Sequence, residues 1–198
     1  KATIVSAIGG NGDSRNSSSN AGHGIYSKGD LNISDNATIG TAKGGDGTAD
    51  DGTGGTGIYS AGRLFISGGE IQQATGGAST NGSGGSGIYS SVIDLSGSLE
   101  LTAKAGSPNG KALLQAGHEL DLDTIKDKLD PGAKVTVTDA DGKVNQVSIP
   151  RPVEPEEPVI PEESSSSSDG GSATPSTPAS PLPGLTVTDK SGAVISYT

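Results

Sequence analysis

Tyrosine occupies one fixed position of a repeated tetrapeptide, and its side chain is the one in this chain best suited to holding a ligand. The tetrapeptide Gly-Ile-Tyr-Ser occurs three times, at residues 24–27, 57–60 and 87–90. A tyrosine ring offers an apolar face and a hydroxyl group that hydrogen-bonds, which is the combination that a sugar requires. The candidate ligand-binding residues are therefore Tyr26, Tyr59 and Tyr89.

The neighbouring isoleucines decide which way these rings point. Successive side chains of a strand face opposite sides, so an inward Ile25 turns Tyr26 outward, and the same holds in the other two copies. Stacked strands lie about 5 Å apart, so the three rings should form a ladder on the surface. Two interpretations stay open: the ladder binds a sugar, or it only stabilises the surface by about 0.5–1 kcal/mol per pair.

A second candidate site is the acidic loop from Asp46 to Gly52. Asp46, Asp50 and Asp51 could supply the carboxylate oxygens that calcium prefers. Their spacing matches neither the EF-hand loop nor the glycine-rich calcium repeat. Calcium is thus the one cofactor that the sequence suggests, and a solvated loop is the alternative.

Catalytic chemistry has little support in this chain. The two histidines, His23 and His118, are far apart in sequence, and no Ser-His-Asp arrangement can be argued from them. We take His23 as a loop residue rather than a ligand. Asp30 and Arg63 occupy matching positions in successive repeats, which predicts that they pair across the ladder as a surface contact rather than as a catalytic dyad. The protein is therefore not expected to be an enzyme.

The elements that position these residues follow from the period of the repeat. The copies start 33 and then 30 residues apart, a period typical of solenoids. Each copy leads into a segment with alternating apolar residues, such as 31–34, and then into a third short strand, such as 37–39. The sequence predicts an all-β fold: a parallel β-helix, a single-stranded solenoid of about four coils, over residues 1–130. Residues 2–5 resemble the end of a preceding coil.

A fourth coil is predicted to be degenerate, as terminal repeats are. Leu113 stands where Ile25 does, and residues 120–122 stand for the strand at 31–33. Leu114 replaces the tyrosine, so the ladder should end after three rings. Residues 122–131 are expected to form a cap of one or two helical turns, with Asp123 as the N-cap.

The C-terminal part divides into three segments. Residues 131–149 are expected to form a β-hairpin or cap, residues 150–183 an acidic Pro/Ser-rich linker, and residues 184–198 a further strand or hairpin segment. The segments 134–144 and 185–194 resemble each other. They are either two independent hairpins or strands of one small β-module.

Composition limits the functions that remain. The net charge is −10, and half of it lies in the linker, so no basic patch exists to bind nucleic acid. There is no cysteine, and no apolar stretch is long enough to span a membrane. Glycine- and serine-rich repeats without cysteine are common in bacterial surface proteins. We expect a secreted or cell-surface bacterial protein whose export signal lies upstream of Lys1.

One family resemblance adds to this account. The pattern Gly-Ile-x-x-x-Gly-x-Leu-x-Ile-Ser-Gly-Gly-x-Ile, from Gly57 to Ile71, resembles the β-helical surface proteins of Firmicutes, some of them carbohydrate-binding domain-containing proteins. The resemblance implies a right-handed β-helix that binds polysaccharide, in some members with calcium. Relatives often carry Asp before Gly-Ile, where this chain has His23, Thr56 and Ser86.

The function expected from sequence is therefore a binding or adhesion module of a Gram-positive bacterium, with polysaccharide as its partner. A purely structural stalk is the alternative, and a polysaccharide lyase or hydrolase is less favoured.

Overall fold

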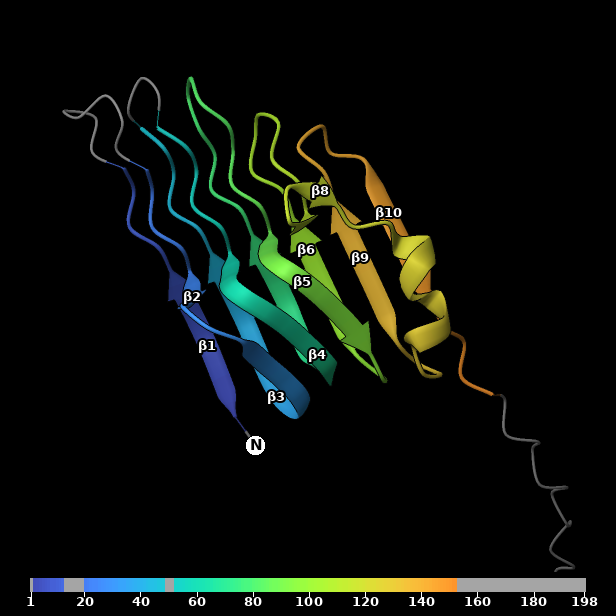
Figure 1. The fold of residues 1–198 in the computed structure, drawn as a ribbon. Coiled ribbons are helices and arrows are strands. Elements are labelled where there is room, and N and C mark those ends of the chain that lie inside the picture. Colours follow the sequence, from blue (N-terminus) through green and yellow to red (C-terminus); the bar gives the residue numbers. More distant parts are fainter. Residues whose placement is uncertain (1, 13–19, 49–51, 153–198) are drawn as a thin grey trace, which may run out of the picture. The chain divides into compact units, whose positions relative to one another are not determined.

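The computed structural model describes residues 2–12, 20–48 and 52–152. These residues form an all-β solenoid of about four turns, in which stacked parallel strands run from β1 at one end to β9 at the other (Figure 1). The elements in chain order are β1 (Thr3–Ile8), β2 (Ile25–Ser27), β3 (Leu31–Lys43), β4 (Ile58–Thr75), β5 (Ile88–Ser96), β6 (Glu100–Lys104), β7 (Leu113–Gln115), β8 (His118–Glu119), the 3-10 helix η1 (Leu122–Lys128), β9 (Lys134–Thr138) and β10 (Val144–Ser148).

The three tetrapeptides lie in register on adjacent coils. Ile25 pairs with Ile58, Ile58 with Ile88, and Ile88 with Leu113 of β7, all in parallel strands. Alternation places these side chains inward, and those of β4, β5 and β7 are fully buried. The predicted β-helix is confirmed, and Leu113 takes the place in the fourth coil that the sequence predicts.

The third strand of each coil forms a second stack. Ile4 pairs with Ile39, Ile39 with Ile71, Ile71 with Leu101, and Leu101 with Val135 of β9. β1 is therefore the third strand of an earlier coil, as its sequence predicts. The strands expected within one coil are joined in β4 into a single bent strand of 18 residues.

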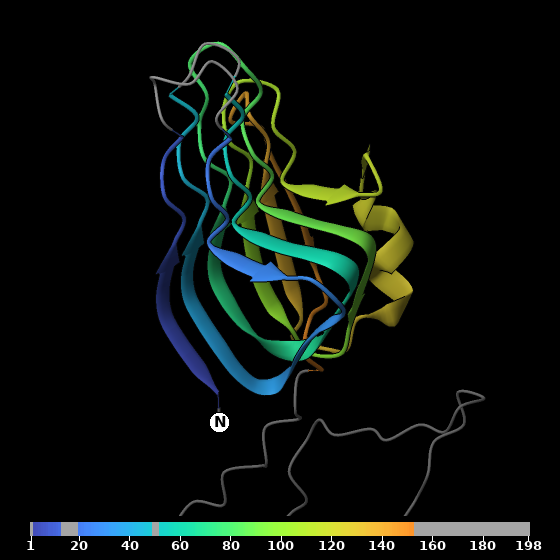
Figure 2. The same ribbon diagram turned by 60° about the vertical axis from the view of Figure 1, so that its left-hand side comes forward.

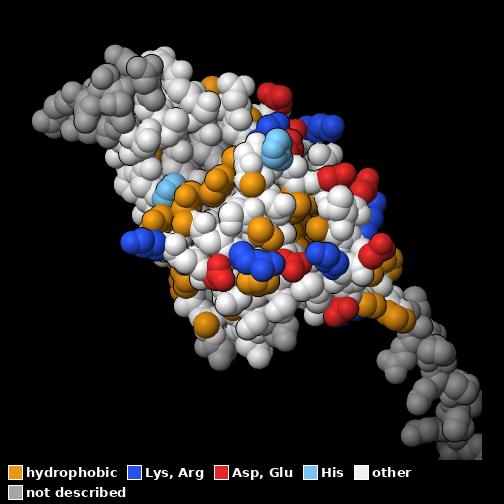
Figure 3. Space-filling model, viewed as in Figure 1, with side chains coloured by type: hydrophobic (Ala, Val, Ile, Leu, Met, Phe, Trp, Pro, Cys, Tyr) orange, Lys and Arg blue, Asp and Glu red, His pale blue; other side chains and the backbone are white. Residues whose placement is uncertain are grey.

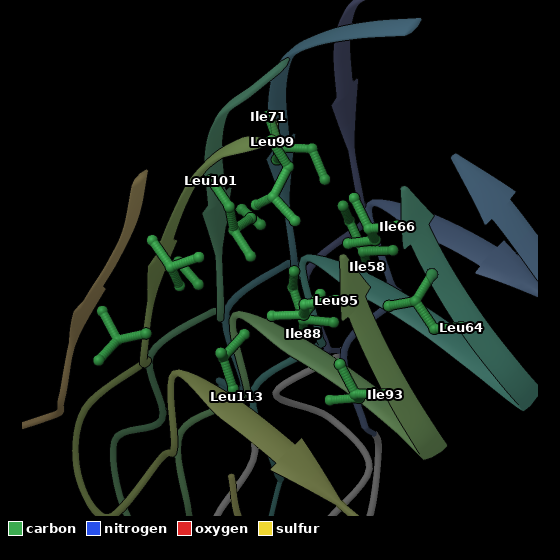
Figure 4. Packing of buried hydrophobic residues seen from close by; sticks show 14 of the residues in the cluster. Ile58, Leu64, Ile66, Ile71, Ile88, Ile93, Leu95, Leu99, Leu101 and Leu113 are labelled. Atoms are coloured by element: carbon green, nitrogen blue, oxygen red, sulfur yellow. The ribbon is translucent and has the colours of Figure 1, made fainter. Parts of the chain in front are cut away.

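Aliphatic side chains from the two stacks meet inside the coil. In Figure 4, Ile71, Leu99 and Leu101 point across the interior toward side chains from the first half of β4, from β5 and from β7. A fully buried Leu or Ile contributes about 1.5–3 kcal/mol. A few such residues per coil hold the fold together although only 30% of the chain is hydrophobic.

The glycine-rich segments between coils, where described, are joined by backbone hydrogen bonds. The amide of Gly77 donates to the carbonyl of Gly55 (2.8 Å), and the amides of Gly85 and Gly106 continue the series onto Gly77 and Gly85 (2.8 Å each). A Cβ added to Gly77 would lie 1.8 Å from the carbonyl oxygen of Gly45. Glycine is needed here because the backbones approach so closely. Figure 2 shows the narrow extension that these segments make on one side of the coils.

The last coil departs from the predicted repeat. Ala116 and Gly117 have φ angles of 47° and 84°. Positive φ at both central residues is the geometry of a tight hairpin turn, so β8 runs antiparallel to β7. The prediction that residues 120–122 form a strand equivalent to 31–33 is therefore wrong.

The expected helical cap is present as η1, with a different N-cap. The side chain of Asp121 accepts a hydrogen bond from the amide of Asp123 (2.9 Å), so Asp121 is the N-cap and the prediction of Asp123 is wrong. Ile125 of η1 is buried in the core.

A β-hairpin ends the described part of the chain. β9 and β10 are antiparallel, and β9 also pairs in parallel with β6. The hairpin therefore continues the stack of third strands. The predicted linker beyond residue 152 and the segment 184–198 lie outside the described residues. Within the described ranges no helix is long and apolar enough to cross a membrane.

Candidate binding site on the tyrosine ladder

The three tyrosines form the ladder that their spacing predicts. Tyr26 pairs with Tyr59 and Tyr59 with Tyr89 in the parallel strands β2, β4 and β5. The ring centroids of Tyr26 and Tyr59 are 5.4 Å apart with an interplanar angle of 14°, and those of Tyr59 and Tyr89 are 5.0 Å apart at 10°. Tyr26 is 59% exposed. Tyr59 and Tyr89 are half-buried. The three rings are therefore parallel, and the exposed ring is that of Tyr26.

This stacking determines which parts of the rings remain available. Both faces of Tyr59 are covered, one by Tyr26 and the other by Tyr89. Tyr89 is followed in its column by Leu114, which ends the ladder as predicted. A ligand that lies along the ladder therefore meets ring edges and hydroxyl groups. On the other side of Tyr26 no described strand pairs with β2.

The ring of His23 also belongs to the stack. The sequence indicates that His23 is a loop residue, but not that its ring contacts the tyrosines. Its ring stacks on Tyr59 (4.5 Å between centroids, 15°) and on Tyr26 (5.8 Å, 8°). Its Nδ1 accepts a hydrogen bond from the amide of Thr56 (3.0 Å). Partial burial lowers the pKa of His23 below its usual value. The only feature of the sequence that could have indicated this stacking is the position of His23, three residues before Tyr26.

The serine that follows each tyrosine holds the bend of the chain below the ladder. Ser60 is fully buried, and its hydroxyl donates to the carbonyls of Gly29 (2.9 Å) and Arg63 (3.2 Å). Ser90 repeats this one coil later with the carbonyls of Gly62 (2.8 Å) and Val92 (2.9 Å). Each serine therefore ties its own bend to the preceding coil, a role that sequence reasoning did not identify.

A row of charges runs beside the ladder. Figure 3 shows basic and acidic side chains alternating below a line of hydrophobic ones. The carboxylate of Asp30 accepts a hydrogen bond from the backbone amide of Arg63 (2.7 Å), whereas the guanidinium lies over the ring of Phe65 (5.0 Å). The two residues are in contact on the surface, but through the backbone of Arg63; in the described part of the chain their charged groups form no ion pair. Lys128 pairs with Asp94 at 3.1 Å.

The proposed calcium ligands are only partly described. Asp46 Oδ1 accepts a hydrogen bond from the amide of Ala78 (2.9 Å), and Oδ2 lies 3.7 Å from Lys43 Nζ. Asp50 and Asp51 lie outside the described residues. Among the residues that the structure describes, no three His, Cys, Asp or Glu side chains are grouped so as to hold a metal ion. The Asp46 carboxylate links one glycine-rich segment to the next.

Comparison with known proteins adds no relative: no family model matches the chain, and neither a curated protein nor a solved structure matches it. The site is therefore interpreted from its own geometry.

Proposed function

We propose that this protein is a non-catalytic binding module that holds a polysaccharide along its tyrosine ladder. The observation that carries the proposal is the row of parallel, stacked rings at Tyr26, Tyr59 and Tyr89, of which Tyr26 is exposed and the other two are half-buried. A binding surface that repeats every 5 Å or so suits a ligand that is itself extended and repetitive.

The chemistry of the row favours hydrogen bonding over stacking. Because the rings cover one another, a sugar chain would lie across their edges and bond to the phenolic hydroxyls. One sugar ring can also stack at Tyr26, on the side where no described strand pairs with β2. His23 offers Nε2 beside the row, since its Nδ1 already accepts from Thr56.

The surroundings fit an uncharged or weakly charged glycan. The charges beside the ladder alternate in sign (Figure 3), and Lys128 pairs with Asp94. No one sign of charge dominates there, so the row offers no continuous basic surface for a nucleic acid. We place the protein outside a bacterial cell, either secreted or on the cell surface.

A glycan array tests the proposal. The full chain is expected to bind a subset of immobilised polysaccharides, and the triple variant Tyr26→Ala/Tyr59→Ala/Tyr89→Ala should lose that binding while circular dichroism shows it folded. Binding that survives in the folded variant would refute the role of the ladder. Running the array with and without calcium also tests the calcium binding that the sequence suggests for Asp46, Asp50 and Asp51.

A structural stalk is the second candidate, and one observation favours it. Each internal ring face of the ladder is already used by a neighbouring ring, so the tyrosines stabilise the solenoid whether or not a ligand is present. No binding to any glycan on the array would support the stalk, and release of shortened products would indicate the third possibility, an enzyme.

A further inference from the structure

The backbone of the solenoid sets the spacing of the tyrosine ladder. Tyr26, Tyr59 and Tyr89 occupy one column of paired residues in the parallel strands β2, β4 and β5, and stacked strands lie about 5 Å apart. The ring centroids keep that spacing, at 5.4 and 5.0 Å, with interplanar angles of 14° and 10°. A ligand that contacts every ring must therefore repeat its own groups at the same interval.

The phenolic hydroxyls are the polar groups of the ladder that a ligand can reach. Within the described residues no hydrogen bond joins one of these hydroxyls to another protein group, and none of them is among the buried polar atoms that lack a partner. The hydroxyls of Tyr59 and Tyr89 are therefore accessible, although these residues are half-buried. The ladder thus presents a row of hydrogen-bonding groups, one on each coil.

Small side chains follow the two inner tyrosines. The residues two places beyond Tyr59 and Tyr89 are Ala61 and Ser91, and both are exposed. The hydroxyl of Ser91 donates to the backbone carbonyl of Gly62, so this side chain lies along the backbone. Neither side chain is long enough to cover the neighbouring ring edge. A chain of sugars can therefore approach the inner tyrosines from this side.

The linkage between sugars decides whether a glycan can match the interval of the ladder. Positions 1 and 4 lie opposite each other across a pyranose ring. When both linking bonds are equatorial, as in β-1,4-linked glucose, mannose or xylose, the chain runs straight. Successive sugars then advance by one ring length, which is close to the spacing of about 5 Å between stacked strands. An axial bond, as in α-1,4-linked glucose, or a 1,3 linkage turns the chain at every sugar, so such a chain curves away from a straight row.

From these observations we propose that the ligand of the ladder is an extended β-1,4-linked glycan that lies parallel to the solenoid axis, with one sugar at each tyrosine. This inference rests on the proposed function, because it names the class of polysaccharide that the ladder holds. Successive sugars of such a chain turn over and present their two edges alternately. Both edges carry oxygen atoms that can hydrogen-bond to a phenolic hydroxyl, so every tyrosine finds a partner. A curved glycan would leave some of the hydroxyls without one.

Glucose tetramers that differ only in linkage test this proposal. Calorimetric titration of the full chain compares tetramers joined by β-1,4, α-1,4 and β-1,3 bonds, together with the β-1,4 tetramers of mannose and xylose. The best β-1,4 tetramer is expected to bind at least about tenfold more tightly than the α-1,4 and β-1,3 tetramers, because it can hydrogen-bond at every tyrosine.

The triple variant Tyr26→Phe/Tyr59→Phe/Tyr89→Phe separates failure of this inference from failure of the proposed function. If an α-1,4 or β-1,3 tetramer binds as tightly as the best β-1,4 tetramer and the triple variant loses that binding, the β-1,4 geometry is refuted and the proposed function stands. If no glycan binds, or if the triple variant binds as well as the wild type, both are refuted.

An added tyrosine tests the register between sugars and coils. Leu114 follows Tyr89 in its column, so Leu114→Tyr should place a further hydroxyl in line with the others. For a β-1,4 chain one sugar longer than the shortest chain that reaches full affinity for the wild type, affinity should rise at least about threefold. Leu114→Phe is the matched control, because it adds the ring without the hydroxyl and should give no gain.

Tyr89→Phe removes one hydroxyl from the row and keeps the test decisive if Leu114→Tyr does not fold. Its affinity for the longer chain should fall at least about threefold. Unchanged affinity in Tyr89→Phe would overturn the proposal. So would an equal gain in Leu114→Tyr and Leu114→Phe, or no gain in a folded Leu114→Tyr variant.

Discussion

The isoleucine and tyrosine columns of the tetrapeptide lie one residue apart and face opposite environments. Ile58 and Ile88 are fully buried, whereas the adjacent Tyr59 and Tyr89 stack on the surface. Both columns have the same register and the same spacing between strands. The difference between them comes from alternation alone, so one repeat builds the core and displays a regular surface at once.

This difference separates what the fold needs from what a ligand could use. The isoleucine column is stabilised by burial of apolar area. The tyrosine column adds ring contacts of about 0.5–1 kcal/mol per pair but is not needed to close the coil. The following variants, ordered from the largest expected effect to the smallest, test that separation.

Ile58→Ala should destabilise the solenoid by about 2–5 kcal/mol, because it leaves a cavity in a fully buried stack. Tyr59→Ala, its neighbour, should cost less, about 1.5–3 kcal/mol, through three lost ring contacts, those with Tyr26, Tyr89 and His23. Urea unfolding followed by circular dichroism measures both. Equal losses for the two variants would contradict the division of roles.

Gly77→Ala tests whether glycine is required in the segments between coils because their backbones approach closely. Its Cβ would overlap the carbonyl of Gly45, and a loss of about 1–3 kcal/mol is expected. Gly29→Ala is the matched control, because its Cβ would meet nothing within 4 Å. If the melting temperatures of both variants change equally, close backbone approach is not the reason that glycine is required at position 77.

Ser60→Ala should cost about 1 kcal/mol, because it removes a buried hydroxyl that donates to two carbonyls. The control is Ser27→Ala, whose hydroxyl donates within its own coil, to the carbonyls of Gly29 (3.1 Å) and Asp30 (3.3 Å), and does not join two coils. A smaller loss is expected there. A larger loss for Ser27→Ala in the same urea series would argue against this role for the serine.

The smallest effect concerns pH and His23. Its pKa is lowered in the folded protein by partial burial, so the unfolded chain binds the proton more readily. The stability that His23 contributes is complete above its ordinary pKa of about 6.5 and falls as pH drops through the folded value. His23→Phe keeps the stack but removes this group. Its melting temperature should fall less than that of the wild type between about pH 7.5 and about pH 5.

The repeat made most of the fold predictable. Ile25, Ile58 and Ile88 identify themselves by their shared context, and parallel stacking follows from the period. The end of the solenoid was less predictable. Residues 120–122 look like a strand, but the left-handed conformation of Ala116 reverses the chain before them. Apolar alternation carries no information about that turn.

The site was predictable only where it follows the strand period. Alternation was enough to place Tyr59 outward. The contacts of His23 depend on the next coil, since its partner Thr56 is 33 residues away, and no local pattern reports such a contact. The buried role of Ser60 was missed for the same reason, because its acceptor Gly29 belongs to the preceding coil.

The most direct test of the binding account is the triple variant Tyr26→Phe/Tyr59→Phe/Tyr89→Phe, titrated against the polysaccharide that the array selects. The rings and their stacking remain, so the melting temperature should stay within a few degrees of the wild type. If the glycan bonds to the hydroxyl edges, as proposed, affinity should fall by at least about tenfold. Unchanged affinity in the stable variant would contradict the account.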